Sequence, residues 1–480
     1  MREKLATRLK LAYGVGQVAE GLKNGAFGTF LVFYYVQVLG LSGTLAGFAV
    51  GLAVVVDAFT DPLAGSVSDN WHSKRGRRHP FIFAAILPLA ICFYLLFNPL
   101  VTGDTALFIW LLVFTNATRT AMSFYHVPHI ALGAEMSEDY DERSNLVSFR
   151  LFFSYVGVLL AYGLGTWLFF RPSAEFQSGQ LDATAYPPYA LALALLMVIS
   201  VFWSAWHTRV LIPNLPQAKP GASTKIVGVL LQVLVDLRDA MRSRSFRWLF
   251  LGVLIVFIMA GIDSGLNLFV FTYFWELPTG QLGLLLVMFP LGVMIGVFFS
   301  ARLFRRFSKK TGLIFGALSW PFWQTLPVVL RLLGWFPENS DELLLPILMV
   351  MRFIQGVCTI QAHVAFSSMV ADIIDEHELE TGKRQEGIFF AAASFSSKAT
   401  SGIGNIIAGF ALDIIGWPRG PEVKTAADVA PETIVDLGLV YGPYFALFGF
   451  VSVWCYTHYN LTRERHEEIL QALAIRRQER

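Results

Sequence analysis

The chain has 480 residues, of which 55% are hydrophobic and 15% are charged, and its mean hydropathy is +0.55. A soluble domain typically carries about a quarter charged residues, so this composition excludes a soluble globular protein. The formal net charge is +2, and the cations are spread between hydrophobic segments, which leaves no basic surface for nucleic acid. We therefore expect a membrane protein whose partners are lipid and a small molecule, with no nucleic-acid partner.

Twelve apolar segments follow one another along the chain, each near the ~20 residues that a membrane-spanning helix needs. Their centres lie near residues 26, 56, 88, 118, 158, 198, 258, 290, 322, 356, 400 and 448. An even number of spans places both termini on one side of the membrane. The loops on that side hold most of the cations, so the positive-inside rule makes it cytoplasmic. The sequence predicts a multi-pass integral protein of the cytoplasmic (plasma) membrane with both termini in the cytoplasm.

A weak internal repeat divides the chain near its middle. Ala134–Arg143 is echoed by Ala371–Glu380, about 237 residues further on, and Lys74–Arg78 is echoed by Arg305–Lys310. Parallel repeats of this kind are typical of transporters built from two bundles. The predicted organisation is an N-terminal six-helix bundle over 1–212, a cytoplasmic middle loop over 213–245, a C-terminal six-helix bundle over 246–460 and a cytoplasmic tail over 461–480.

Motifs for enzymatic chemistry are not found in the sequence. Cys92, Cys358 and Cys455 lie in apolar stretches without the spacing of metal ligands, and we interpret them as small packing residues. The chain has no nucleophile elbow, no phosphate-binding Gly-Lys motif and no His-Glu-x-x-His motif. We therefore expect neither an enzyme nor a bound cofactor.

Ionisable residues inside the predicted spans are the strongest functional signal. A charged group at membrane depth costs several kcal/mol unless it is paired or wetted. On several spans the polar residues recur at intervals of three and four, which places them on one helix face. Such faces predict a shared aqueous cavity that binds a solute. The candidate solute-binding residues are Glu20, Lys23, Asn24, Arg119, His126, Arg150, Asp263, His363 and Lys398.

Some of these residues also fit a structural role. Glu20 and Lys23 fit an internal ion pair as well as a ligand role. A buried histidine is more often a satisfied structural donor, although we favour a functional role for His126. For Asp263 and His363 the structural and the functional interpretation have equal weight.

Asp57 and Asp61 lie one turn apart on the second span, with the Thr60 hydroxyl beside them. Carboxylate and hydroxyl oxygens are ligands for hard cations, and a carboxyl group removed from water also holds a proton. We predict a site for Na⁺ or H⁺ here. The alternative is that Asp57 only neutralises Lys398 or Arg150, while Asp61 caps its helix end. Lys398 in turn fits either a link between the cation and solute sites or a simple pair with an aspartate.

A charged loop follows the second span. It contains Asp69, Arg75, Arg77 and Arg78 at a helix end. We interpret this loop as a cytoplasmic latch, in which ion pairs with the mirrored loop or with neighbouring helix ends hold one access state. The simpler alternative is that its cations anchor the protein at the membrane surface.

Several motifs together resemble a known family. Over nearly its whole length the chain resembles the glycoside-pentoside-hexuronide:cation symporters, the melibiose-carrier group of the major facilitator superfamily. The resemblance implies an all-α integral membrane fold with twelve transmembrane helices in two six-helix bundles, the major facilitator superfamily fold. The segments that carry it are Tyr13–Gly16, Asp57–Gly65 with Ser68–Asp69, Arg77–Phe81, His126–Pro128 and Ala371–Asp375.

The resemblance also implies a cation site. In that family, aspartates at the positions of Asp57 and Asp61 bind sodium, lithium or a proton, with help from the residues that match Thr60 and Ser123. All four residues carry side-chain oxygen. We therefore expect Na⁺ or H⁺ as the coupling ion, with Li⁺ as a further candidate, and a possible Na⁺ site at Asp57 and Asp61.

The solute site departs from the family pattern. Arg150 and Lys398 are similar to positions that the family uses at its sugar and coupling sites. The two carboxylates with which melibiose-type carriers hold sugar hydroxyls are replaced by Gly21 and His126, and Arg119 is added. Fewer acceptors and more cationic donors favour a carboxylate, sulfonate or phosphate on the solute.

The sequence therefore predicts a cation-coupled secondary active symporter of a sugar-like or anionic small solute, which works by alternating access. A lysolipid-type or other amphiphile carrier of the same fold is the first alternative. A non-transporting membrane receptor is a remote one, because it does not need buried charges on many helices. We expect the protein to be a monomer.

Overall fold

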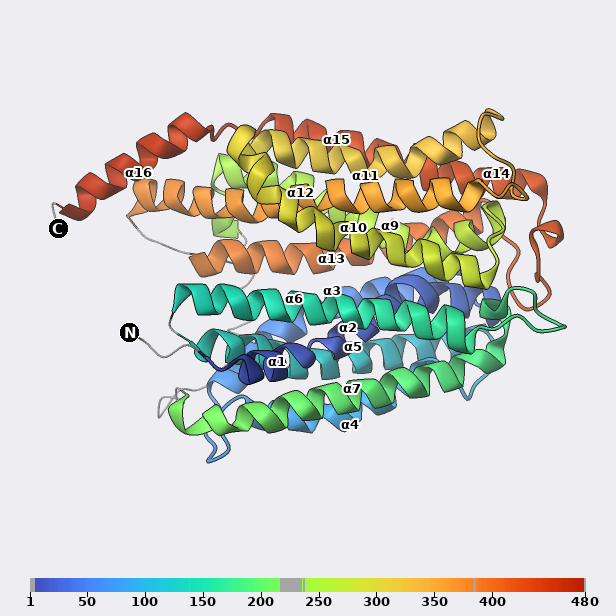
Figure 1. Ribbon diagram of the computed structural model, residues 1–480, viewed down its shortest axis with the longest axis horizontal. Coiled ribbons are helices and arrows are strands. Elements are labelled where there is room, and N and C mark those ends of the chain that lie inside the picture. The colour runs from blue at the N-terminus through green and yellow to red at the C-terminus, as the bar shows by residue number, and fades with distance from the viewer. Residues whose placement is uncertain (1–4, 138, 216–234, 236–237, 383–385, 479–480) are drawn as a thin grey trace. The chain divides into compact units, whose positions relative to one another are not determined.

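The structure, a computed structural model, describes residues 5–137, 139–215, 235, 238–382 and 386–478. Every regular element within these residues is a helix (Figure 1). The first predicted span consists of four consecutive pieces: α1 (Thr7–Val15), α2 (Val18–Ala26) and the π-helical turns η1 (Phe27–Leu31) and η2 (Tyr34–Val38). The first half continues with α3 (Gly43–Asp69), α4 (His79–Leu96), α5 (Asp104–Glu135), α6 (Tyr140–Gly163), η3 (Leu164–Phe169), η4 (Gly179–Leu181), η5 (Ala183–Ala185), α7 (Tyr186–Thr208) and η6 (Arg209–Asn214).

The second half repeats this pattern of long helices. It contains α9 (Arg244–Phe269), η7 (Val270–Phe274), α10 (Thr279–Arg306), α11 (Lys309–Leu332), α12 (Leu344–Thr381), α13 (Glu386–Ile414), η8 (Ala426–Asp428), α14 (Pro431–Leu439), η9 (Val440–Tyr444), α15 (Phe445–Thr457) and α16 (Arg463–Gln478). Within the described residues, ten helices are long and apolar enough to cross a membrane. The other two predicted spans correspond to the interrupted helix over 7–38 and to α13, which has a shorter apolar stretch at Thr400–Ile414.

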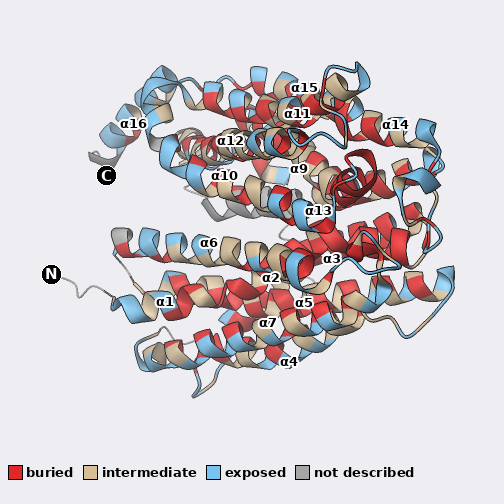
Figure 2. Ribbon diagram, turned by 45° about the vertical axis from the view of Figure 1, so that its right-hand side comes forward, coloured by how far each residue is buried: buried red, intermediate tan, exposed pale blue. Residues whose placement is uncertain are grey.

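Large apolar side chains are exposed along the helices. Leu87 is 65% exposed, Phe298 is 76% exposed and Phe450 is 63% exposed. Figure 2 shows exposed residues along the length of helices such as α4 and α6, and not only at their ends. Many exposed large apolar side chains are unfavourable in water but match the hydrocarbon of a bilayer. The exposure therefore agrees with a chain whose solvent is lipid.

The chain forms two compact units. Unit 1 consists of Met1–Val229, Ser264–Val287 and Asn405–Ile434, and unit 2 consists of Leu230–Asp263, Met288–Gly404 and Val435–Arg480. Two segments of the second half thus pack with the helices of the first half. The predicted middle loop over 213–245 falls mostly on residues 216–234 and 236–237, which lie outside the described residues.

Close packing in unit 1 relies on glycine where two helices cross. α2 packs on α6, and a Cβ atom at Gly21 would collide with the carbonyl oxygen of Ser154 and come within 2.9 Å of the Cα of Gly157. Gly157 is equally restricted, because a Cβ there would meet Val18 and Gly21. In the sequence, Gly21 stands where the similar family has a carboxylate. In the structure, this position lies at a helix crossing that has no room for a larger side chain.

The predicted outer ends of both halves meet within unit 1. The indole Nε1 of Trp417 donates to Gln37 Oε1 at 2.8 Å, and Thr279 Oγ1 donates to Gln180 Oε1 at 2.7 Å. The carboxylate of Asp413 accepts from the backbone N–H groups of Gly43 and Thr44 at 3.0 and 2.8 Å, which caps the start of α3. These contacts explain why 264–287 and 405–434 belong to unit 1.

Unit 2 has its own core and an additional helix. α11 packs on α12 and α15, and the predicted tail forms α16, which packs on α12. Ile469 and Leu473 of α16 are buried in the apolar cluster of this unit. His466 of the same helix contacts Asp375 at 3.1 Å between Nε2 and Oδ2. The tail is therefore an integral part of unit 2.

We predict that Gly21→Ala lowers the thermal unfolding temperature of the purified protein, because overpacking a close helix crossing costs about 1–3 kcal/mol. Gly280→Ala is the matched control, because no atom lies within 4 Å of a Cβ at Gly280. That variant should unfold at the wild-type temperature or slightly above it. Equal unfolding temperatures for the two variants would contradict the packing role of Gly21.

Candidate functional site

Asp57 is the centre of a polar cluster between α3 and α5 in unit 1. Its side chain is almost fully buried. Ser123 Oγ donates to Asp57 Oδ1 at 2.8 Å, and Thr60 Oγ1 lies 3.3 Å from Ser123 Oγ. Thr60 also donates to the backbone oxygen of Asp57 at 3.2 Å. The structure thus brings together three of the four residues of the predicted cation site, and the fourth, Asp61, lies one turn further along α3.

Arg119 of α5 occupies the other side of Asp57. Its Nη1 lies 3.3 Å from Asp57 Oδ2, and Asp61 contributes to its electrostatic surroundings. The guanidinium carbon lies 5.5 Å from the centre of the Phe27 ring. The sequence assigns Arg119 to the solute and offers Lys398 or Arg150 as structural partners of Asp57. In unit 1 the guanidinium that reaches Asp57 is that of Arg119.

Glu20 and His126 form a second polar contact in unit 1. His126 Nε2 lies 3.7 Å from Glu20 Oε1, and Ser154 Oγ donates to Glu20 Oε2 at 3.4 Å. This contact joins α2 to α5 and α6. Of the neighbouring candidates on α2, Lys23 is buried and Asn24 is exposed.

Arg150 lies on α6 beside the first helix. Its guanidinium faces the hydroxyl of Tyr13. Within the described part of the chain, we find no ion pair formed by Arg150. The nearby His129 is fully buried, and its Nδ1 accepts a hydrogen bond from Gln17 Nε2 at 2.8 Å. Its Nε2 lies 3.2 Å from Ser204 Oγ, and its ring stacks on Tyr13. His129 therefore has the contacts of a structural residue, whereas Arg150 retains donors for a ligand.

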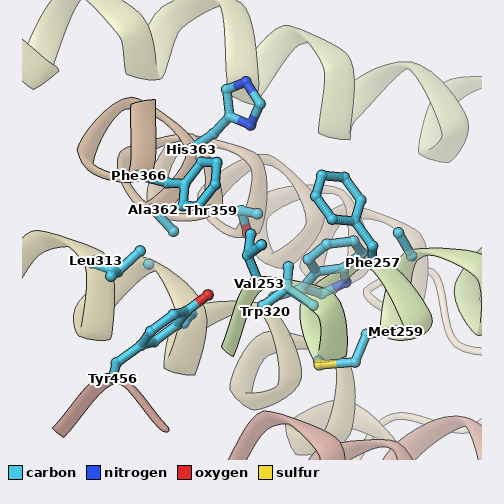
Figure 3. Close-up of a pocket in the computed structure, with 14 residues that line it drawn as sticks. Val253, Phe257, Met259, Leu313, Trp320, Thr359, Ala362, His363, Phe366 and Tyr456 are labelled. Carbon is cyan, nitrogen blue, oxygen red and sulfur yellow. The ribbon is translucent and has the colours of Figure 1, made fainter. Parts of the chain in front are cut away.

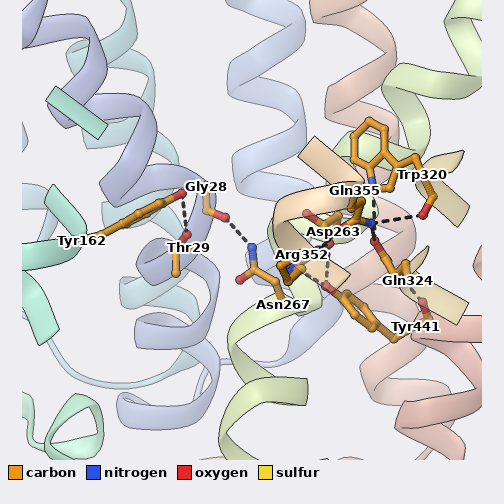
Figure 4. A network of polar contacts seen from close by, with 10 residues as sticks. All are labelled: Gly28, Thr29, Tyr162, Asp263, Asn267, Trp320, Gln324, Arg352, Gln355 and Tyr441. Carbon is orange, nitrogen blue, oxygen red and sulfur yellow. Dashed lines mark hydrogen bonds and ion pairs between the residues drawn. The ribbon is translucent and has the colours of Figure 1, made fainter. Parts of the chain in front are cut away.

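Asp263 belongs to a polar network in unit 2. Tyr441 Oη donates to Asp263 Oδ1 at 2.6 Å, Arg352 Nη2 donates to Tyr441 Oη at 3.2 Å, and Arg352 Nη2 lies 3.9 Å from Asp263 Oδ1 (Figure 4). Arg352 Nη1 also donates to Gln355 Oε1 at 2.7 Å, and Gln355 donates to Gln324. The network connects α9, α11, α12 and η9.

The sequence analysis misses this network apart from Asp263. Arg352 is a charged residue inside a predicted span, which is the signal that identifies the other candidates, and it would have been found by the same rule. Tyr441 and Gln355 carry no such signal, because uncharged polar side chains are common in helices. The π-helical turn η9 contains Tyr441, and single π-helical turns are often found at functional sites.

His363 and Lys398 lie elsewhere in unit 2. His363 lines a cavity of about 110 Å³ whose other walls are mainly apolar, including Phe257, Trp320 and Tyr456 (Figure 3). Lys398 lies on α13 among residues whose side chains are outside the described part of the structure. Within unit 2 the structure does not bring His363 to the network of Asp263.

The predicted latch residues form a cluster with one further carboxylate. Arg77 Nη2 and Arg78 Nη2 both lie 2.8 Å from Glu135 Oε1 at the end of α5. Arg78 also pairs with Asp69 and donates to Ser68 Oγ at 2.7 Å. The side chain of Arg75 is exposed. The cluster ties the ends of α3 and α5 to the start of α4, and its role in switching between access states stays a prediction.

Unit 2 has a corresponding cluster at the repeat-related position. Lys309 Nζ contacts Asp372 Oδ1 at 2.7 Å, and His466 Nε2 lies 3.6 Å from the same oxygen. Glu135 and Asp372 occupy equivalent places in the two copies of the repeat. Each carboxylate therefore pairs with a basic side chain at the start of a neighbouring helix.

The geometry of unit 1 combines two chemical capabilities. Carboxylate and hydroxyl oxygens converge at Asp57, and such oxygens are suited to a small hard cation or a proton. Two guanidinium groups, those of Arg119 and Arg150, are suited to the planar oxygens of an acid. Among the described residues we find no cluster of His, Cys, Asp and Glu that would hold a transition metal.

Comparisons with known proteins agree with a transporter. Residues 12–463 match the family described as MFS/sugar transport protein. The glucuronide carrier protein homolog of Escherichia coli (strain K12) is 26% identical, with 98% of this chain and 96% of the relative covered. The putative glycoside/cation symporter YagG of the same organism is 24% identical, with 98% and 95% covered. Among solved structures, the xylose transporter XylE from E. coli has a TM-score of 0.60 at 14% identity and covers 97% of this chain and 99% of that one.

We predict that Glu135→Gln strongly lowers the unfolding temperature. It leaves two arginines without their shared carboxylate, and breaking a buried ion pair typically costs about 3–5 kcal/mol. Asp69→Asn is the matched control, because the Asp69 side chain is 53% exposed while that of Glu135 is 11% exposed. The control should lose less than about 1 kcal/mol. A loss for Asp69→Asn as large as that for Glu135→Gln would contradict this ranking.

Proposed function

The chain belongs to the MFS/sugar transport protein family, and on that basis we propose that it is a cation-coupled secondary symporter of a sugar-like solute that carries an acidic group. It is an integral multi-pass membrane protein with the major facilitator superfamily fold and is not an enzyme. The observation that carries the proposal is the buried cluster at Asp57, where a carboxylate, two hydroxyl groups and a guanidinium meet between two membrane-spanning helices.

The cluster at Asp57 supports cation coupling. A buried carboxylate beside hydroxyl oxygens offers the ligands that Na⁺ prefers, and the same carboxylate is suited to carry a proton. The relative named as a glycoside/cation symporter is consistent with this use. We propose Na⁺ or H⁺ as the coupling ion, with Asp57 and Asp61 as its main ligands. In alternating access, occupancy of this site favours solute binding and the change of access state.

The charges around the cluster support an acidic solute. Arg150 has guanidinium donors that no described carboxylate uses, and the Gly21 position cannot hold a carboxylate because the chain of α6 fills the space. The carboxylate of Glu20 is already in contact with His126. A relative named as a glucuronide carrier protein homolog provides a precedent for a sugar acid. We therefore propose a glycoside or sugar derivative with a carboxylate or sulfonate.

The proposal includes the orientation in the membrane. The cation-rich loops support a cytoplasmic position for both termini. The clusters around Glu135 and Asp372 then lie at the cytoplasmic ends of their helices, and the contacts of Trp417 with Gln37 lie at the outer ends. We propose that the functional unit is a monomer, because each chain carries both halves of the expected pathway.

Uptake into proteoliposomes tests the function. We expect an inward Na⁺ or H⁺ gradient to drive accumulation of p-nitrophenyl β-glucuronide, and faster uptake of it than of p-nitrophenyl β-glucoside. The two probes differ only in whether the sugar carries a carboxylate or a hydroxymethyl group, so they isolate the effect of the charge. Strong uptake of the neutral glucoside with no uptake of the glucuronide would overturn the proposed acidic solute.

We predict that Asp57→Asn abolishes the dependence of uptake on the cation gradient. The amide keeps the shape of the side chain but loses the negative charge that binds a cation. The measurement is the ratio of glucuronide uptake with and without the gradient, which should fall to about one in this variant. Asp104→Asn, at an exposed position outside the cluster, should keep the wild-type ratio. A full gradient response in Asp57→Asn would remove Asp57 from the cation site.

A further inference from the structure

Arg119 and a coupling cation would both bind the negative charge of Asp57. Asp57 Oδ1 accepts a hydrogen bond from Ser123, and Asp57 Oδ2 accepts one from the guanidinium of Arg119. Both side chains are largely removed from solvent, with 15% of Arg119 and 6% of Asp57 exposed. A second positive charge brought to Asp57 would repel the guanidinium and remove the reason for its position.

We propose that Arg119 is a switch that is shared between the cation site and the solute site. While no cation is bound, the guanidinium pairs with Asp57. When a cation neutralises Asp57, Arg119 is released and binds the acidic group of the solute. This inference rests on the proposed symport of an acidic solute and adds the residue that couples its two binding events.

The contacts of Arg119 are those of a residue held at one point. It reaches Asp57 through a single Nη1 atom at 3.3 Å, and its Nε is buried without a hydrogen-bond partner. A guanidinium has five N–H donors and binds a carboxylate most strongly through two parallel hydrogen bonds. The pair with Asp57 uses only one such bond. An acidic solute can offer a planar pair of oxygens, so it provides a better partner than Asp57 provides.

The position of Arg119 on α5 connects the two sites. Arg119, Ser123 and His126 are separated by four and three residues, so they lie along one face of the helix. Ser123 belongs to the cluster of Asp57, whereas His126 contacts Glu20 on α2. A long arginine side chain on this face needs only to rotate about its own bonds to leave Asp57.

The exchange explains coupling in thermodynamic terms. The solute can bind well only in the fraction of molecules whose Arg119 is released, so its apparent affinity is reduced by that fraction. A cation at Asp57 raises the fraction and therefore tightens solute binding. By linkage, the solute tightens cation binding by the same factor. One side chain thus links the two ligands without contact between them.

Binding of p-nitrophenyl β-glucuronide to purified protein in nanodiscs, measured by calorimetry, tests the switch. Sodium chloride is compared with choline chloride at equal ionic strength. We expect sodium to tighten binding to the wild type by about tenfold or more. Asp57→Asn should bind the glucuronide without sodium as tightly as the wild type does with it, because its Arg119 is permanently released. This variant should not tighten binding of the neutral p-nitrophenyl β-glucoside.

Two further variants separate the switch from a structural role. Arg119→Gln should bind the glucuronide about tenfold more weakly in both salts, while the sodium concentration for half of its thermal shift should fall below that of the wild type. Asp263→Asn is the matched control, since Asp263 is also a buried carboxylate beside an arginine, Arg352. It should not produce tight sodium-free binding, because its arginine belongs to a different network.

Glucuronide binding by Asp57→Asn that is no tighter than that of the sodium-free wild type would overturn the switch. So would an Arg119→Gln variant whose sodium affinity is unchanged or weaker. If Asp57→Asn is not obtained as folded protein, the sodium affinity of Arg119→Gln decides alone. Failure of the proposed function has a different result: the wild type then transports neither glycoside under a Na⁺ or H⁺ gradient, a result that does not depend on these variants.

Discussion

The cost of placing a charge in hydrocarbon determines where the ionisable groups of this protein lie. That cost is several kcal/mol for a group that is neither paired nor wetted. In unit 1, Asp57 meets Arg119, and Glu20 meets His126; in unit 2, Asp263 meets Tyr441 and Arg352. All of these contacts connect different helices. Each therefore neutralises a charge and also fixes how two helices pack, so a ligand that changes one contact changes the packing.

The cost of an unpaired charge also explains why the two copies of the internal repeat share charged positions although few of their residues are identical. Glu135 and Asp372 differ in length, and their partners Arg78 and Lys309 differ in type. Each pair nevertheless places a carboxylate of one long helix against a basic side chain at the start of another. What the repeat preserves is the charge and its position on the helix. Sequence identity is not needed for either, because several side chains carry the same charge.

Much of the fold follows from the sequence because a bilayer fixes the length and the composition of each span. The shared face of Asp57, Thr60 and Asp61 on α3 also follows from their spacing, whereas Ser123 on α5 is assigned to the site by the family resemblance. Spacing cannot identify a partner on another helix, so the contact between Arg119 and Asp57 has no signal in the sequence. The interrupted first span and the π-helical turn at Tyr441 likewise have no signal in hydropathy, because they change hydrogen bonding and not composition.

The outer and inner ends of the helices differ in the kind of contact that holds them. At the predicted outer ends, unit 1 is joined by neutral hydrogen bonds, such as Trp417 to Gln37 and Thr279 to Gln180, and by glycine contacts. The ion pairs at these ends, Arg419 with Asp104 and Lys424 with Glu175, are exposed to solvent and therefore weak. A neutral hydrogen bond contributes about 0.5–1.5 kcal/mol, whereas breaking a buried ion pair costs about 3–5 kcal/mol. In a carrier that works by alternating access, the outer contacts must break in each cycle. Many weak contacts are suited to that task, whereas the stronger ion pairs at Glu135 and Asp372 are suited to a latch that holds one access state until a ligand changes it.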